Sequence, residues 1–291
     1  MWGLWQCICR KSPFLCIQER IIPTKWLTLR KEVSSIFRKM NVTNSIIKFV
    51  SSLAQKKYRD KEGCFVAEGT KCVRDTWQHF DCRMIIATQN WYDTFGNSSH
   101  LGKLYIANRG QMQRMSQFAT TSEVIAVYNI PQPDLEPKAE QDGINIVLDG
   151  IQDPGNLGTI IRLADWYGIR NIFCSKQTVD VYNHKVVQAT MGAISRVKVS
   201  YCDLEALMSE SSLPVYGTTL DGDNIYSTEL ASSAFVVFGN EGNGMSERLK
   251  SLATKNLCIP SGTANGEGSE SLNVSIAAAI TISEFCRNRL K

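Results

Sequence analysis

The feature that most constrains the fold is a series of short apolar runs in the second half of the chain, separated by helical stretches. Five such runs occur, at residues 144–148, 171–174, 215–218, 235–238 and 257–259. Most are apolar almost throughout, which is typical of strands whose two faces are both covered by helices. The spacing therefore predicts repeated strand–helix units, and hence an α/β domain with a parallel sheet over residues 144–291.

A smaller α/β unit is expected upstream, over residues 41–130. Residues 45–54 place their apolar side chains on one helical face, and Cys64-Phe-Val-Ala67 is typical of a short strand. The remaining elements that we expect are a helix over 70–80 and strands at 83–87, 103–106 and 123–128. Residues 131–143 carry three prolines and almost no apolar side chain, so they are predicted to be a linker between the two domains.

Residues 1–40 differ from the rest of the chain. They hold eight Lys/Arg against two Asp/Glu, a net charge of +6, and three of the six tryptophans, without a clean helical or strand period. An organellar targeting segment has similar charge, although Ser is scarce here. The favoured interpretation is an N-terminal extension of unknown role, or a start codon assigned too early, with Met40 as the true start.

The basic charge is confined to the first 80 residues. The net charge is +3 over residues 41–80, −2 over 81–143 and −3 over 144–291. If the partner is an acidic polymer such as RNA, the N-terminal part should therefore bind it. The candidate phosphate contacts lie in one short stretch and are Lys56, Lys57, Arg59 and Lys61. The alternative interpretation of this stretch is the solvated end of a helix.

Several classes of protein are disfavoured. The chain has no run of eighteen apolar residues, so we expect no membrane span. It has no HExxH motif, no CxxC pair and no GxSxG motif, so a metal site and a serine hydrolase are not expected. The ten cysteines of a chain this long are expected to be reduced, as in a cytoplasmic protein.

Three polar, glycine-rich segments follow predicted strands. The first is 149–164, in which Asn156 is expected to cap a helix and Arg162 lies one turn inside it, among apolar residues. For Arg162 the alternative is a surface position with a buried stem. The second is Phe238-Gly-Asn-Glu-Gly-Asn-Gly244, which is neither a P-loop nor a GxGxxG motif, and which could be a plain turn.

The third segment, 259–273, leads into an Ala-rich helix, with Ser271 and Asn273 placed as capping residues. Loops at the carboxyl ends of neighbouring parallel strands form a crevice, which is the usual ligand site in open α/β sheets. The three loops therefore predict one binding site.

Taken together, the three segments resemble the signature motifs of the SpoU (TrmH) family of RNA 2′-O-ribose methyltransferases. The resemblance rests on 156–164 as the first motif, 238–245 as the second, and Ile259-Pro with 271–278 as the third. It covers residues 144–291 strongly. Residues 41–130 are more loosely similar to the family's RNA-binding domain, above all Phe65-Val-Ala-Glu-Gly69. The loop between Pro260 and Ser271 looks longer than the corresponding loop in compact members of the family.

The resemblance implies a SPOUT-type α/β fold with a C-terminal trefoil knot, a homodimer, and S-adenosylmethionine bound at the knot without a metal. By family analogy the cofactor would contact Gly239, Ile259 and Leu272, with Thr218 and Thr219 as weaker candidates. The same analogy assigns catalytic importance to Asn156, Arg162, Glu241, Ser271 and Asn273.

The resemblance implies methylation of a ribose 2′-hydroxyl, and ribosomal RNA is the expected substrate because of the extra N-terminal domain. A guanidinium keeps its proton above a pH of about 12, so we expect Arg162 to clamp a phosphate and not to act as the base. The alternatives are a tRNA 2′-O-methyltransferase and a non-catalytic protein of RNA binding or ribosome assembly. A nicotinamide oxidoreductase is disfavoured because GxGxxG is missing.

Overall fold

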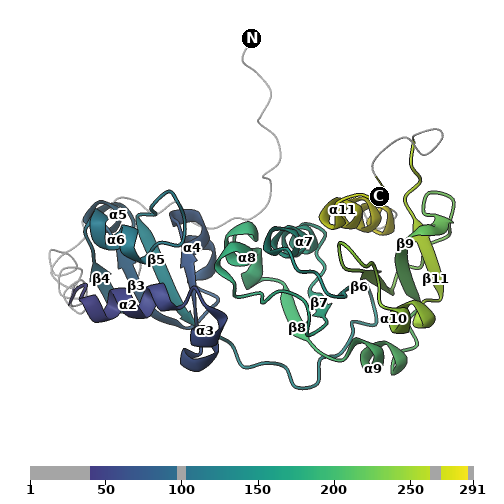
Figure 1. Ribbon diagram of the computed structural model, residues 1–291, viewed down its shortest axis with the longest axis horizontal. Helices are drawn as coiled ribbons and strands as arrows, with labels where there is room; N and C mark the ends of the chain where they lie inside the picture. The colour runs from purple at the N-terminus through teal and green to yellow at the C-terminus, as the bar shows by residue number, and fades with distance from the viewer. Residues whose placement is uncertain (1–39, 97–102, 263–269, 288–291) are drawn as a thin grey trace, which may run out of the picture. The chain divides into compact units, whose positions relative to one another are not determined.

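The computed structural model describes residues 40–96, 103–262 and 270–287, and Lys39–Lys291 form one unit by their contacts. These residues build two β-sheets, each with its own helices (Figure 1). The interpretations of residues 1–39 lie outside the described residues. Every helix that the structure describes is too short or too polar to cross a lipid bilayer.

The first sheet has five strands in the order β1-β4-β3-β5-β2 and is mixed. Strands β1, β4 and β3 run parallel, whereas β5 pairs antiparallel with both β3 and β2. Its strands are β1 (Met40–Asn41), β2 (Cys64–Glu68), β3 (Cys82–Ala87), β4 (Lys103–Ile106) and β5 (Val124–Asn129). Its helices are α2 (Asn44–Ser52), α3 (Lys56–Glu62), α4 (Thr70–Thr76), α5 (Gln89–Phe95) and α6 (Arg109–Met115).

The second sheet has six strands in the order β11-β9-β10-β6-β7-β8, and all five neighbouring pairs are parallel. Its strands are β6 (Ile144–Leu148), β7 (Asn171–Cys174), β8 (Lys198–Tyr201), β9 (Val215–Asn224), β10 (Ala234–Phe238) and β11 (Lys255–Cys258). Its helices are α7 (Pro154–Trp166), α8 (His184–Ala189), α9 (Leu204–Ser209), α10 (Glu247–Leu252) and α11 (Val274–Cys286), with a 3-10 turn at Ala193–Ser195.

Helices cover both faces of this sheet, which explains its continuous apolar strands. Along β6, Ile146 and Leu148 pack with α7, α8 and α11, whereas Val147 packs on the opposite face with α9 and α10. Figure 1 shows α7 and α11 together on one side and α9 and α10 on the other. All residues of β6 and β10 are buried. The predicted α/β class and parallel sheet are confirmed.

Two strands of this sheet differ most from the sequence-based expectation. β8 was not predicted, because it is an edge strand of mixed polarity. β9 extends to Asn224, beyond the expected 215–218, because its register on β11 shifts after Gly217 and the ladder resumes at Asp223. The residues between these two positions bulge out of the ladder at the carboxyl edge of the sheet.

Candidate active site

The three glycine-rich segments meet at the carboxyl edge of the six-stranded sheet. The first follows β6, the second follows β10, and the third follows β11. β6 and β10 are adjacent, and chain connections run away from this pair in opposite directions, as at a topological switch point. The sheet therefore brings together loops that lie about a hundred residues apart in the sequence.

A chain of side-chain hydrogen bonds joins one residue from each loop. Asn156 Nδ2 donates to Glu241 Oε1 over 3.0 Å, and Asn273 Nδ2 donates to Asn156 Oδ1 over 3.0 Å. Asn273 Oδ1 in turn accepts from the backbone N–H and the hydroxyl of Ser275, so Asn273 caps α11. The predicted capping role of Asn273 is confirmed, and the same amide also links α11 to α7.

Asn156 is not the helix cap that the sequence predicted. α7 begins earlier, at Pro154, and Asp153 is its cap, accepting from the Asn156 N–H over 2.8 Å. Proline suits the first helical position because its missing N–H would have no partner there. The shift leaves the Asn156 side chain, which is 8% exposed, free to bridge the other two loops.

Two further residues that sequence reasoning missed hold the second loop against the first. Asn240 Nδ2 donates to the Gly150 carbonyl over 2.7 Å, and Asp149 Oδ2 accepts from the Ser246 N–H over 2.8 Å. Asn240 lies inside the second motif and Asp149 directly follows β6. Both could have been recognised as candidate site residues because they lie just after strands of the parallel sheet.

Glu241 is held as an ionised carboxylate. Its partial burial would raise its pKa, but hydrogen bonds from Asn156 and from backbone N–H groups, including those of Gln152 and Asp153, outweigh burial and lower the pKa below the ordinary value. A carboxylate that accepts several hydrogen bonds orients its donors and has little tendency to take a proton.

Arg162 and Ser271 take no part in the hydrogen bonds that link Glu241, Asn156 and Asn273. Arg162 is exposed and forms no hydrogen bond or ion pair with any described residue. It lies six residues after Asn156, about two thirds of a turn around the helix, so the two side chains leave α7 in different directions. Ser271 is exposed beside residues 263–269, which are not described. Its predicted capping role is wrong, since Asn273 caps α11.

The candidate cofactor residues also lie at this edge. A side chain cannot be added at Gly239, because its Cβ would stand 2.2 Å from the Met245 nitrogen. Thr218 Oγ1 donates to the Val237 carbonyl, whereas Thr219 Oγ1 is buried without a hydrogen-bond partner. Ile259 is half-buried against the core and Leu272 is 48% exposed. A tight backbone at Gly239 and an unsatisfied hydroxyl at Thr219 fit a site that receives a polar ligand.

The basic stretch does not form one surface cluster. Lys56, Lys57 and Lys61 are exposed on α3, but Arg59 is only 2% exposed. Its guanidinium pairs with Asp180, 121 residues away, so the prediction that Arg59 contacts RNA phosphates is wrong in this structure. A buried, paired guanidinium is not available to a phosphate.

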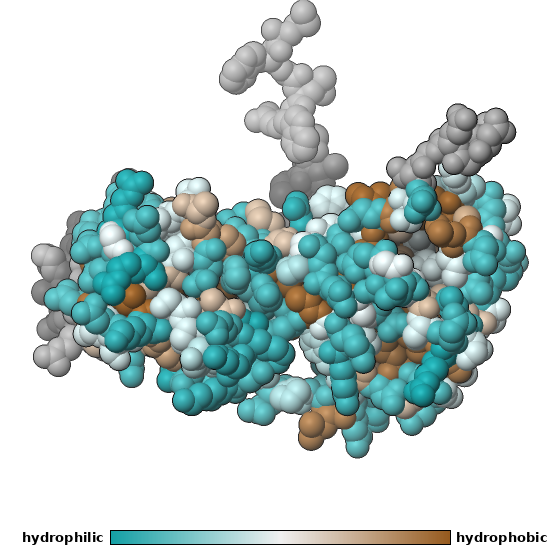
Figure 2. Space-filling view, in the orientation of Figure 1, coloured by the Kyte–Doolittle hydropathy of each residue, from teal (hydrophilic) through white to brown (hydrophobic). Residues whose placement is uncertain are grey.

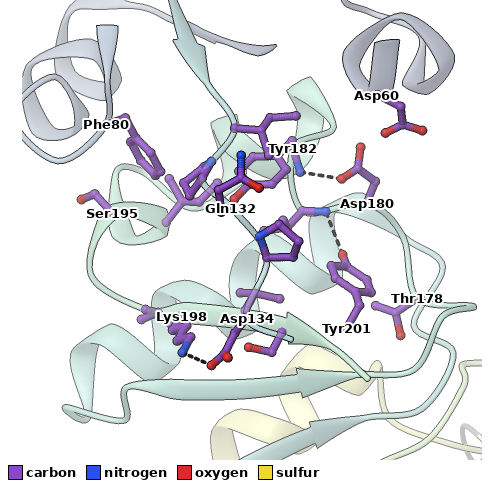
Figure 3. Close-up of a pocket in the computed structure, with 18 of the residues that line it drawn as sticks. Asp60, Phe80, Gln132, Asp134, Thr178, Asp180, Tyr182, Ser195, Lys198 and Tyr201 are labelled. Carbon is purple, nitrogen blue, oxygen red and sulfur yellow. Dashed lines mark hydrogen bonds and ion pairs between the residues drawn. The ribbon is translucent and has the colours of Figure 1, made fainter. Parts of the chain in front are cut away.

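A pocket of about 670 Å³ lies away from the glycine-rich loops (Figure 3). It is lined by α3, by residues 130–134 where the linker begins, by Thr178 and 180–182, and by the edge strand β8. Neither the predicted catalytic residues nor the predicted cofactor contacts line it. Within the described part of the chain, no group of three His, Cys, Asp or Glu could hold a metal ion.

Comparison with known proteins assigns the family. The model of the SpoU rRNA methylase family matches residues 143–283, and that of the MRM3-like substrate binding domain matches 44–126. A solved structure from Porphyromonas gingivalis, assigned to the TrmH family of RNA methyltransferases, is 37% identical, with a TM-score of 0.75. The match covers 85% of this chain and 99% of that one. The chain belongs to the SpoU (TrmH) family.

Two further proteins are similar over nearly their whole length. The 23S rRNA (guanosine(2553)-2′-O)-methyltransferase RlmP of Bacillus subtilis is 28% identical. The match covers 82% of this chain and 95% of the length of RlmP. The structure of an AdoMet-bound rRNA methyltransferase from Sinorhizobium meliloti is 26% identical, with a TM-score of 0.75, over 87% of this chain and 98% of its own.

Proposed function

We propose that this chain is an enzyme that transfers a methyl group from S-adenosylmethionine to a ribose 2′-hydroxyl of RNA, with ribosomal RNA as its substrate. The observation that carries the proposal is the chain of hydrogen bonds from Glu241 through Asn156 to Asn273. It joins all three family motifs at the edge of the sheet where open α/β proteins bind ligands. The names of the B. subtilis and S. meliloti relatives support the substrate class and the cofactor.

S-adenosylmethionine, when bound, supplies a methyl group already activated on a sulfonium. The residues that would hold it are Gly239, Ile259 and Leu272, with the hydroxyl of Thr219 as a polar contact and Thr218 bonding β9 to β10. The close backbone at Gly239 and the unsatisfied Thr219 Oγ1 support this assignment. A substituent at Gly239 would push the second loop away from the site.

The protein's own groups then have to orient the ribose and assist loss of its proton. Arg162 offers a guanidinium that no described residue engages, so we assign it to an RNA phosphate next to the reacting ribose. A fixed positive charge there lowers the pKa of the hydroxyl. Glu241 and Asn156 position the loops, and Ser271 and Asn273 shape the pocket. Exposed Lys56, Lys57 and Lys61 bind the RNA backbone at a distance.

We include a homodimer in the proposal. Arg162 and Trp166 lie four residues apart on one face of α7, and Trp166 is 83% exposed. On the neighbouring α11, Ile276 is 51% exposed, and Figure 2 shows hydrophobic surface over this helix. A second copy that covers this surface would bring Arg162 to the interface, where it could complete a site that lacks it within one chain.

We also include the trefoil knot. β11 is the outermost strand of the sheet, yet Asn273 reaches back past β9 and β10 to bond Asn156 on α7. Such a return crossing supports a threaded C-terminal segment. A cytoplasmic location and a role in rRNA processing stay predictions.

The test is methyl transfer by the purified chain from labelled S-adenosylmethionine to rRNA and tRNA taken from cells that lack it. We expect a 2′-O-methylated nucleoside in digested rRNA by mass spectrometry. Label in tRNA alone would favour the tRNA enzyme. RNA binding without transfer, in a protein that shows no calorimetric binding of S-adenosylmethionine, would favour the non-catalytic assembly protein and contradict our proposal.

A further inference from the structure

Arg59 is one of two charged residues in the described part of the chain that are only 2% exposed, with Glu68, and its partner lies in the methyltransferase domain. Arg59 Nε and Nη2 donate to Asp180 Oδ2 over 3.0 and 2.6 Å. Nη1 donates to the carbonyls of Leu53 and Ala54 over 2.9 and 2.8 Å. Asp180 Oδ1 accepts from the Tyr182 N–H, so both ends of the pair are anchored to backbone.

Other contacts between the same two regions are mostly apolar, and a hydrogen bond from Ser195 Oγ to the Asp75 carbonyl is long, at 3.4 Å. Helix α8 packs against β2, and the rings of Phe65 and Tyr182 lie 4.7 Å apart between their centroids. Apolar contacts have little directional preference, so this contact alone leaves rotation about it weakly restricted. The Arg59–Asp180 pair is directional, because a planar guanidinium bonds along fixed directions.

A pocket lies beside the ion pair. The pocket of about 670 Å³ borders Asp180 and Tyr182, and α3 contributes Lys56 and Asp60 to its wall (Figure 3). Side chains do not pack across this pocket, so the substrate-binding domain can turn if the directional contact beside it is lost. The orientation of the domain should then depend strongly on the ion pair.

The geometry points to Arg59 and Asp180 as positioning residues that fix how RNA is presented to the methyl-transfer site. α3 carries the exposed lysines on one side and buried Arg59 on the other. RNA bound by these lysines is therefore held at a set orientation to the loops at β6 and β10. This inference rests on the proposed RNA methyltransferase activity, and it adds a role for residues outside the three motifs.

The primary test is Asp180→Asn, which keeps the shape and an acceptor for the Tyr182 N–H but removes the charge. We expect kcat for RNA methylation to fall about tenfold or more, because small misplacements of a reacting group are costly. The Kd values for RNA and for S-adenosylmethionine should change less than about threefold, since neither site contains Asp180. Arg59→Lys should behave in the same way, because the three donors of an ammonium lie on one nitrogen and cannot span the acceptors that Nε, Nη1 and Nη2 of Arg59 reach.

The matched control is Glu284→Gln. Glu284 lies in α11 and pairs with Arg287, the residue that caps the end of this helix, and its side chain is 15% exposed, as that of Asp180 is. This control should keep wild-type kcat. Loss of RNA affinity with unchanged kcat in Asp180→Asn would overturn the proposal, because it would make the pair part of RNA binding.

A distance measurement tests the inference without activity. Spin labels on non-natural residues at exposed Lys48 and Glu210 report the separation of the two domains. We expect a narrow distance distribution in the wild type and a broad or shifted one in Asp180→Asn. An unchanged distribution would refute the positioning role. If the wild type shows the narrow distribution but methylates no RNA, the proposed function fails while the positioning contact stands.

Discussion

The loops at the carboxyl edge of the six-stranded sheet and the helix α3 both depend on an ionised side chain, but they satisfy it differently. At the sheet edge, Glu241 accepts hydrogen bonds from uncharged donors and remains partly exposed. In α3, Arg59 meets the opposite charge of Asp180 away from water. The loops around Glu241 leave space for a ligand. The charge of Arg59 is neutralised by Asp180, and this ion pair holds the two domains together. An ionised group indicates a binding site only when its surroundings leave it accessible.

The largest effect on methyl transfer is expected at Arg162. Its guanidinium is exposed, whereas that of Arg59 is buried and paired. Arg162→Lys keeps the charge but loses the planar fork, so methyl transfer should fall about a hundredfold or more. Single-turnover assays with labelled S-adenosylmethionine measure this loss. Arg170→Lys, at another exposed arginine, is the control and should be neutral. Near-normal turnover of Arg162→Lys would refute the phosphate clamp.

A smaller effect is expected at the exposed face of α3. Changing Lys56, Lys57 and Lys61 together to Gln should raise the Kd for RNA about tenfold at low salt and reduce the salt dependence of binding. The control is the same change at Lys185, Lys250 and Lys255 in the methyltransferase domain. Filter binding over a range of salt concentrations separates the two sets. Equal affinities would mean that these lysines are only a solvated helix face.

The smallest effect concerns the protonation of Glu241. Its pKa is lowered in the folded protein, so its contribution to stability is present above the ordinary carboxylate pKa of about 4.3 and is lost as pH falls through the lower folded value. Glu241→Gln should therefore melt a few degrees below the wild type at pH 7, and this gap should close in acid. Calorimetry between pH 7 and 3 measures it. A gap that is constant with pH would show that ionisation of Glu241 does not hold the loops.

Much of the second domain could be predicted from the sequence. β6 and β7 have the expected bounds, because buried parallel strands are continuous apolar runs. The convergence of Asn156, Glu241 and Asn273 also followed from their positions after strands of one sheet. Local cues were less reliable. Asn156 was predicted to cap a helix. The helix begins about one turn earlier, because Asp153 caps it and Pro154 suits its first position.

By itself, the sequence determined the buried strands of the second sheet and the motifs that follow them, because hydrophobic period and turn chemistry are local properties. Only the tertiary structure decided that Arg59 faces inward. No local signal separates it from Lys57 two residues earlier, and its partner Asp180 lies 121 residues further along the chain. The role of a charge depends on what lies across from it, and long-range packing sets that neighbour.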